Sequence, residues 1–182
     1  MVSTIQDIMS LSHPAEAELL VSVFDLTHFT RYSRGAPSSK LFRQMSEFAG
    51  MCAEFVQSRG GVMIKFIGDA GLCIFPGPDS SAAVNTLVEL KSKMDAWLKT
   101  EIPGSHLAVN CHFGPVTIGP MPGFAGQNQL DVIGETVNIC FTLGKQGFII
   151  SPQAFRSLDA SARKQFRKFT PPITYHLGNP AG

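Results

Sequence analysis

The chain has 182 residues and a formal net charge of +1, with 44% hydrophobic and 16% charged residues. A chain of this length fits one domain with a sizeable buried core. Its charge is nearly balanced and its Lys and Arg residues do not cluster, which argues against a general nucleic-acid-binding protein. The 14 phenylalanines and the single tryptophan predict a core rich in apolar aromatic side chains.

The four cysteines lie singly in apolar segments, at Cys52, Cys73, Cys111 and Cys140. Zinc sites usually place their cysteines in closely spaced pairs, so these residues predict reduced, buried thiols instead. No stretch approaches the roughly 18 apolar residues that a membrane helix requires, and the N-terminus lacks the pattern of a signal peptide. We therefore expect a soluble, cytoplasmic protein without a membrane partner.

The first half of the chain alternates apolar strands with a long helix. Residues 1–17 carry a weak helical pattern and are expected to form an N-terminal extension to a domain over 18–182. Residues 19–24 predict a central strand that ends at Asp25. Spacings of three and four predict a helix from about residue 37 to 58. Two apolar strands within 61–75 then predict a hairpin with Asp69 at its tip.

The second half predicts a further long helix and a mixture of shorter elements. The helix is expected over 79–99, and the short helix that follows later over 134–143. The other expected elements are strands at 106–113 and 115–119, a loop at 120–129, a strand at 148–150, a helix from Ser151 and a last strand at 173–177. This order predicts an α+β, ferredoxin-like fold with a mostly antiparallel sheet and helices packed on it.

Two aspartates stand where apolar strands give way to turns, at Asp25 and Asp69. Carboxylates at strand ends can converge on one sheet edge and hold two hard cations that bridge phosphate oxygens. Each aspartate alone also has a conformational explanation, since Asp25 can cap the following turn and Gly-Asp turns are common. The residues by themselves leave both interpretations open.

A third segment places a carboxylate just before a short helix that carries an amide. It reads Leu130-Asp131-Val132-Ile133-Gly134-Glu135-Thr136-Val137-Asn138-Ile139. Together with Val23-Phe24-Asp25-Leu26-Thr27-His28-Phe29-Thr30 and Lys65-Phe66-Ile67-Gly68-Asp69-Ala70, it resembles the active-site segments of the class III adenylyl and guanylyl cyclases. The resemblance covers roughly residues 19–178 and implies the catalytic-domain fold of that family.

The resemblance implies a metal site and a phosphate site. Asp25 and Asp69 match the aspartates that hold two magnesium or manganese ions in the family. Leu26 matches a position whose main-chain carbonyl also reaches a metal. Phe29 and Thr30 belong to the turn whose backbone is expected to bind the substrate phosphates.

The resemblance also implies a base preference. Lys65 and Asp131 match the lysine and aspartate that read the adenine edge, whereas guanylyl cyclases usually carry glutamate and cysteine there. A lysine donor and a carboxylate acceptor complement the ring nitrogen and the exocyclic amine of adenine, so the sequence favours ATP over GTP. Judged on its own, Lys65 could equally extend its charge to water from a sheet edge.

The helix after Asp131 is expected to complete the site. By resemblance Asn138 orients the ribose, and position 142 should hold an arginine that stabilises the transition state, but the residue is Thr142. Lys145 follows at the same helical spacing and is a candidate substitute, although such a polar stripe is usually a solvated face. Lys168 lies near the position of a phosphate-binding lysine of the family, without the glycine that follows it there.

These residues predict an adenylate cyclase, a phosphorus-oxygen lyase that converts ATP into 3′,5′-cyclic AMP and pyrophosphate with two divalent cations. In the family the metal aspartates and the base-reading pair come from opposite subunits, which implies a homodimer. Thr142 predicts low activity. The alternative is a catalytically impaired cyclase-homology domain that serves as a nucleotide-binding or dimerisation module. The loop at 120–129 fits either a dimerisation arm or a plain connection.

Overall fold

The computed structural model describes residues 2–123 and 126–178. It contains an eight-stranded sheet in the order β2-β3-β1-β4-β6-β8-β7, with β5 paired to β4 outside that path. The strands are β1 (Ala15–Leu26), β2 (Val62–Ile67), β3 (Ala70–Pro76), β4 (Leu107–Pro122), β5 (Asn128–Ile133), β6 (Phe148–Ile150), β7 (Phe166–Phe169) and β8 (Thr174–Leu177). Only the β4–β6 pairing is parallel within this described part.

The helices of the structure include the two long ones that the sequence predicts. They are α1 (Ile5–Met9), α2 (Phe29–Ser33), α3 (Ser38–Gln57), α4 (Ser80–Glu101), α5 (Glu135–Thr142), α6 (Pro152–Ser157) and α7 (Ala160–Arg163), with a 3-10 turn at Gly77–Asp79. The segment β1-α3-β2-β3-α4-β4 has the strand order β2-β3-β1-β4 of a ferredoxin-like unit. The predicted α+β fold is therefore confirmed.

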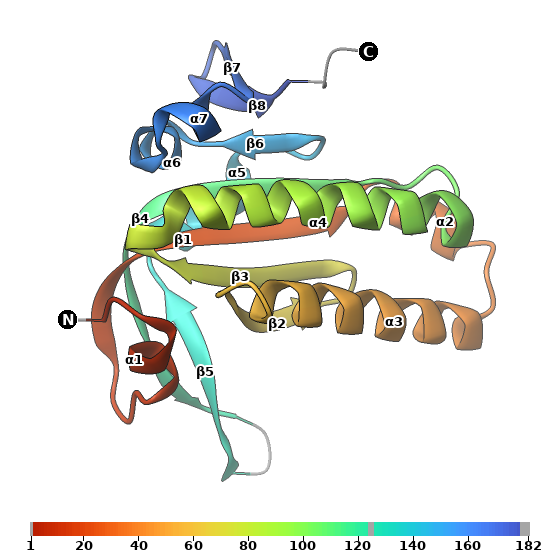
Figure 1. Cartoon of the computed structure of the whole chain (residues 1–182). Helices are drawn as coiled ribbons and strands as arrows, with labels where there is room; N and C mark the ends of the chain where they lie inside the picture. The colour runs from red at the N-terminus through yellow and green to blue at the C-terminus, as the bar shows by residue number, and fades with distance from the viewer. Residues whose placement is uncertain (1, 124–125, 179–182) are drawn as a thin grey trace.

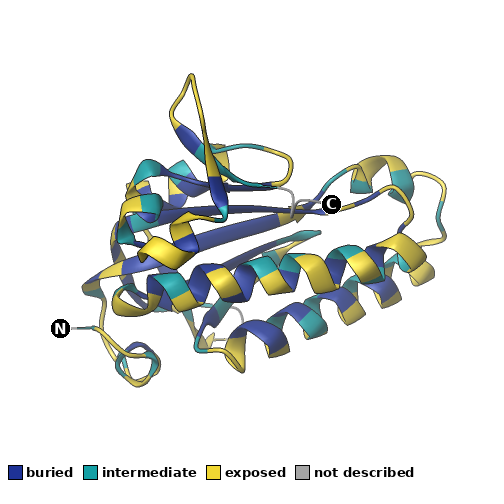
Figure 2. Cartoon of the chain, turned by 45° about the horizontal axis from the view of Figure 1, so that its top comes forward, coloured by how far each residue is buried: buried dark blue, intermediate teal, exposed yellow. Residues whose placement is uncertain are grey.

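Strand β1 lies at the centre of the molecule and is buried on both faces. Its alternate side chains Leu20 and Phe24 pack with the buried residues of α3 and α4, whereas Val21 and Val23 pack with those of α1 and α5. Figure 1 shows α3 and α4 running side by side along one face of the sheet, and Figure 2 shows that each is exposed on the side turned to solvent. Fully burying one such side chain contributes roughly 1.5–3 kcal/mol to the free energy of unfolding.

The structure corrects the prediction in the segment before α5. Residues 107–122 form one continuous strand, β4, instead of two, and β5 covers residues that were expected as a loop and an approach to the helix. The two strands pair from Thr117 opposite Ile133 to Pro122 opposite Asn128, and Figure 1 shows this pair extending away from the rest of the sheet. The expected loop at 120–129 is therefore mostly a hairpin, of which residues 124 and 125 lie outside the described chain.

Two smaller differences concern the ends of the chain. Strand β1 begins at Ala15, earlier than the expected residue 19, and strand β7 was not predicted. Within the described ranges, no helix combines the length and the apolar character needed to cross a membrane.

Candidate active site

The two aspartates converge at one edge of the sheet, as the sequence predicts. Strands β1 and β3 are antiparallel neighbours with Phe24 opposite Gly71, so Asp25 and Asp69 lie just beyond this pair, at adjacent strand ends. Burial raises the pKa of Asp69 to about 6, and the neighbouring Asp25 carboxylate adds to the effect. Two carboxylates are thus held against each other with unfavourable charge between them.

The aspartate pair fits a hard divalent cation. Asp25 Oδ1 accepts a hydrogen bond from the Leu26 amide over 2.9 Å, which orients that carboxylate. Residues 2–123 and 126–178 contain no cluster of three or more His, Cys, Asp and Glu side chains that could hold a metal ion. The other ligands would have to be main-chain oxygens, water or substrate phosphates, which magnesium accepts readily. Leu26 also lines the cavity beside Asp25, and its side chain is buried.

A cavity of about 390 Å³ adjoins Asp25. One wall is the end of β1 with Leu26 and His28, and the opposite wall is formed by Phe141 and Lys145. Lys145 forms no hydrogen bond or ion pair with the rest of the described chain. The lining of the cavity therefore includes both the Asp25 carboxylate and a lysine without a partner among the described residues.

Asn110 supports the wall that carries Lys145. It is a buried amide on β4, 7% exposed, and its Nδ2 donates a hydrogen bond of 2.8 Å to the Gly144 carbonyl oxygen. Sequence analysis did not select this residue, although a single amide inside an otherwise apolar strand is a signal for a specific partner. Asn110 thus fixes the segment next to the cavity.

The turn that follows Asp25 is held by hydrogen bonds to the start of β4. The Thr27 amide donates to the His106 carbonyl oxygen and the His106 amide donates to Thr27 Oγ1, both over 2.9 Å. His28 adopts a left-handed conformation with φ of 60°, which is uncommon outside glycine. Phe29 is half-buried against the core and Thr30 is exposed, so α2 begins beside the cavity.

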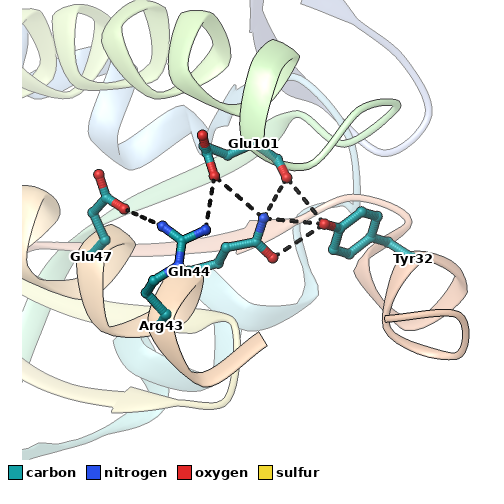
Figure 3. Close-up of polar contacts among 5 residues, drawn as sticks. All are labelled: Tyr32, Arg43, Gln44, Glu47 and Glu101. Carbon is teal, nitrogen blue, oxygen red and sulfur yellow. Dashed lines mark hydrogen bonds and ion pairs between the residues drawn. The ribbon is translucent and has the colours of Figure 1, made fainter. Parts of the chain in front are cut away.

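Helix α2 is fixed at its other side by a buried amide, as Figure 3 shows. The Tyr32 hydroxyl lies 3.2 Å from Gln44 Oε1 and 3.1 Å from the Glu101 carbonyl oxygen. Gln44 is completely buried, and its Nε2 donates to the same Glu101 carbonyl. These contacts connect α2, α3 and the end of α4.

Lys65 and Asp131 form an ion pair between β2 and β5. Lys65 Nζ lies 2.6 Å from Asp131 Oδ2, and Asp131 Oδ1 accepts a hydrogen bond of 2.8 Å from the Val132 amide. The Lys65 ammonium group therefore has a specific partner and does not simply extend to water. The two residues assigned to adenine by resemblance are brought together in one chain.

The two remaining predicted residues are exposed on α5. Asn138 lies on the first turns of the helix, and Thr142 is its last residue. The Thr142 hydroxyl donates to the Ile139 carbonyl oxygen over 2.9 Å, so its proton is used within its own helix. Because α5 ends at Thr142, Lys145 does not continue the polar stripe of this helix, and that expectation is wrong.

The predicted site residues fall into two groups in the structure. Asp25 and Leu26 line the cavity, and Asp69 neighbours Asp25. The second group does not line this cavity and consists of Lys65, Asp131, Asn138 and Thr142. Lys168 lies on β7 and is exposed. One chain thus presents a carboxylate half and a base-reading half at different places.

Comparison with known proteins points to cyclases. The chain is 24% identical to an adenylate cyclase of Anabaena cylindrica over 123 residues, which make up 63% of this chain and 24% of that protein. The chain thus spans about a quarter of the length of this curated relative. No family model matches the chain.

Several solved cyclase structures superpose on nearly the whole chain. A bacterial light-regulated adenylyl cyclase has a TM-score of 0.80 at 16% identity, over 94% of this chain and 54% of that one. The adenylyl cyclase CyaB from P. aeruginosa has a TM-score of 0.77 at 16% identity, over 93% and 97% of the two chains. The guanylyl cyclase Cya2 has a TM-score of 0.74 at 18% identity, over 92% and 96%. The fold of this chain is therefore that of the class III adenylyl and guanylyl cyclase catalytic domains.

Proposed function

We propose that residues 18–182 are an adenylyl cyclase catalytic domain that converts ATP into 3′,5′-cyclic AMP and pyrophosphate, with residues 1–17 as an N-terminal extension. The observation that carries this proposal is the Asp25–Asp69 pair beside a cavity of about 390 Å³. In the reaction the ribose 3′-oxygen bonds to the α-phosphorus and loses its proton to solvent. The bond from the α-phosphorus to the β-phosphate oxygen breaks, and pyrophosphate leaves. Because the substrate is ATP, we place the domain in the cytoplasm.

Two magnesium or manganese ions, when bound, would promote ionisation of the 3′-hydroxyl and neutralise phosphate charge. The residues that would hold them are Asp25, Asp69 and the main chain of Leu26. The raised pKa of Asp69 supports this assignment, because burial and, to a smaller extent, the neighbouring Asp25 carboxylate disfavour the charged form that a bound cation would stabilise. We assign the main chain of Phe29 and Thr30 to the substrate phosphates, since no side chain caps the start of α2.

Adenine recognition is assigned to the Lys65–Asp131 pair. Lys65 Nζ would donate to a ring nitrogen, and Asp131 would accept from the exocyclic amine. The 2.6 Å contact between them supports this role, because it places a donor and an acceptor side by side. The fold is similar to guanylyl cyclases and to adenylyl cyclases, so it does not distinguish ATP from GTP. The proposed preference for ATP therefore rests on the Lys65–Asp131 pair.

A homodimer would join the two groups of residues into complete sites. One copy would contribute Asp25 and Asp69, and its partner would contribute the base-reading pair with Asn138 for the ribose. Three large apolar side chains on β2, β5 and α5 are exposed in the single chain, which supports burial of these elements against a second copy. They are Ile67, Ile133 and Phe141, with exposed fractions of 61%, 59% and 47%. Two-fold symmetry would then generate two equivalent sites.

Thr142 predicts slow turnover. It brings no positive charge to the α-phosphate, and its hydroxyl is already bonded to Ile139. A fixed charge at such a transition state commonly contributes roughly 3–4 kcal/mol. Lys145 would supply part of this charge from the cavity wall, in the same chain as the metal aspartates. The same Thr142 contact favours a second candidate function, a domain that binds ATP without turning it over.

The test is direct measurement of cyclic AMP after incubation of the purified protein with ATP and Mn²⁺ or Mg²⁺. We expect slow formation that disappears in Asp69→Asn and persists in Asp79→Asn, an exposed aspartate at the start of α4. Thr142→Arg is expected to increase the rate. ATP binding without product in the parent protein and in Thr142→Arg would support the binding module instead.

A further inference from the structure

A second cavity lies between α2 and the loop that joins α4 to β4. Its volume is about 370 Å³, and it is lined by His28, Arg31 and Tyr32 on one side and by Pro103, Gly104 and Ser105 on the other. His28 also lines the cavity beside Asp25. The two cavities therefore adjoin at His28, at the turn to which we assign the substrate phosphates.

Both walls of the second cavity are fixed by hydrogen bonds. On one wall, Tyr32 is bonded to the buried Gln44 and to the Glu101 carbonyl oxygen (Figure 3). On the other, the loop continues into His106, whose main chain exchanges two hydrogen bonds with Thr27. The Ser105 amide itself donates to the Ile102 carbonyl oxygen over 3.1 Å. The cavity is thus already formed before any ligand binds, which reduces the cost of binding.

The α2 side of this cavity is positively charged. No acidic residue occurs between Asp25 and Glu47, whereas this stretch contains Arg31, Arg34, Lys40 and Arg43. Arg43 is engaged by Glu47 and Glu101 at 3.6 Å each, and Lys40 lies over the Tyr32 ring. Arg31 and Arg34 form no side-chain hydrogen bond or ion pair with the described residues. Of these two free guanidinium groups, Arg31 is the one that lines the cavity.

Ser105 provides an independent sign of a missing partner. It is 2% exposed, and its hydroxyl has no hydrogen-bond partner among the described residues. A buried polar group without a partner is uncommon and costs roughly 1–3 kcal/mol. Ser105 lines the cavity, so rotation of its side chain would bring the covered hydroxyl to a ligand oxygen, and the guanidinium group of Arg31 favours an anion with several oxygens.

We infer that this cavity binds the terminal phosphate of the nucleotide triphosphate, and the pyrophosphate product, through Arg31 and the Ser105 hydroxyl. The inference deepens the proposed function and rests on it for the identity of the nucleotide. The planar fork of Arg31 matches two oxygens of a phosphate group. The adjoining His28 turn leads from Asp25 to this cavity, so a polyphosphate held beside Asp25 and Asp69 through bound cations would extend toward Arg31.

The first experiment measures binding of inorganic pyrophosphate, with Mg²⁺ present, by isothermal titration calorimetry. We expect Arg31→Gln to weaken binding about tenfold or more, and Arg31→Lys to weaken it less, because a charge-assisted hydrogen bond is lost in the first and only the fork in the second. Ser105→Ala should cause a smaller loss, of about threefold. The matched control is Arg34→Gln, which removes an unpaired guanidinium outside the cavity and should change affinity by less than about twofold. An equal loss in Arg34→Gln, or no loss in Arg31→Gln, overturns the inference.

The second experiment compares ATP, AMP and inorganic phosphate on the same variants. Arg31→Gln should weaken ATP but leave AMP unchanged, because AMP lacks the terminal phosphates. If Arg31 matters for inorganic phosphate and not for ATP, the cavity takes a separate anion and the inference fails. None of these measurements depends on turnover, so an inactive protein whose pyrophosphate affinity depends on Arg31 would refute the cyclase proposal and still support this site.

Discussion

Lys65 Nζ lies 2.6 Å from Asp131 Oδ2, although 66 residues separate the two positions in the chain. The contact joins β2 to the hairpin strand β5, which the sequence did not predict. The Asp131 side chain is 20% exposed, compared with 41% for Lys65, so the carboxylate depends on this partner more than the ammonium group does. The pair is the part of the candidate site that bears on the choice between ATP and GTP.

The first prediction concerns this choice. Replacing both residues, as Lys65→Glu with Asp131→Cys, removes the donor that suits adenine and supplies an acceptor for the ring N–H of guanine. We expect the ratio of kcat/KM for ATP over GTP to fall at least about tenfold. The measurement is cyclic nucleotide formation from each substrate in parallel. An unchanged ratio would show that the base is read elsewhere.

The second prediction concerns pH and the metal-free protein. Burial beside Asp25 raises the pKa of Asp69 from 3.8 to about 6. The folded protein therefore binds this proton more tightly than the unfolded chain, and the resulting stabilisation is present below pH 3.8 and is lost as pH rises through about 6. Without metal, Asp69→Asn should melt about 2–4 °C higher than the parent at pH 8, and the difference should shrink toward pH 4.

Adding Mn²⁺ at pH 8 should make the parent melt at a higher temperature than Asp69→Asn. The ion neutralises both carboxylates of the parent, whereas the variant offers it only the Asp25 carboxylate. Thermal unfolding with and without Mn²⁺ measures both effects. Asp79→Asn, on an exposed aspartate, should respond to pH and Mn²⁺ as the parent does. A parent protein that Mn²⁺ fails to stabilise would contradict the metal assignment.

The third prediction concerns the charge that Thr142 lacks. If Lys145 acts from the cavity wall, Lys145→Ala should lower kcat about tenfold or more, since a positioned charge in such a site commonly contributes at least that much. The double variant Thr142→Arg with Lys145→Ala should recover activity. The control is Lys164→Ala, which removes an exposed lysine at the end of α7. Equal rates for Lys145→Ala and Lys164→Ala would exclude a role for Lys145.

The fourth prediction concerns the buried amide in Figure 3. Gln44→Leu leaves the Tyr32 hydroxyl and the Glu101 carbonyl oxygen without this partner, so we expect the free energy of unfolding to fall by about 2–4 kcal/mol. Arg43→Ala removes two long surface ion pairs, to Glu47 and Glu101, from a side chain that is 61% exposed, and should lower the free energy of unfolding by less than about 1 kcal/mol. Urea unfolding measures both. Similar losses in the two variants would show that the buried amide has no special role.

The fifth prediction concerns the cysteines. All four thiols are buried, and burial raises the pKa of Cys52 and of Cys111 to about 12. The reactive thiolate is therefore scarce at pH 8. We expect a thiol reagent such as DTNB to react slowly with the folded protein and rapidly with all four thiols in guanidinium chloride. Fast reaction of any one thiol in the folded protein would show that its segment opens.

Much of the fold could be predicted because β1, α3 and α4 carry strong periodic patterns. Leu20 and Phe24 alternate with Val21 and Val23 on the two faces of β1, and the long helices bury one side each. The β4–β5 hairpin was missed because β4 contains Pro115, Gly119, Pro120 and Pro122, which usually interrupt strands. A side chain at Gly119 would meet Pro14 at 2.6 Å, so glycine there reflects close packing and not a turn.

The candidate site was predicted only where its residues stand at ends of strands. Asp25 and Asp69 lie next to turns at the ends of β1 and β3, whereas Asp131 lies within β5, two residues before that strand ends. Lys145 follows Gly144, just past the C-cap Leu143 of α5, so the glycine marks the helix end correctly and the helical spacing of Lys145 was the misleading signal. Arg31 and Ser105 come together only through the contact of α2 with the α4–β4 loop, which no local pattern reports.

The central claim is that each site takes its carboxylates from one copy and its base-reading pair from the other. The most direct test mixes two inactive variants, Asp69→Asn and Lys65→Ala, and measures cyclic AMP. In a mixed dimer one site carries both changes and the other carries neither, so we expect about a quarter of the parental activity at equal amounts. Activity that stays at the level of the separate variants, although mixed dimers form, would contradict the account.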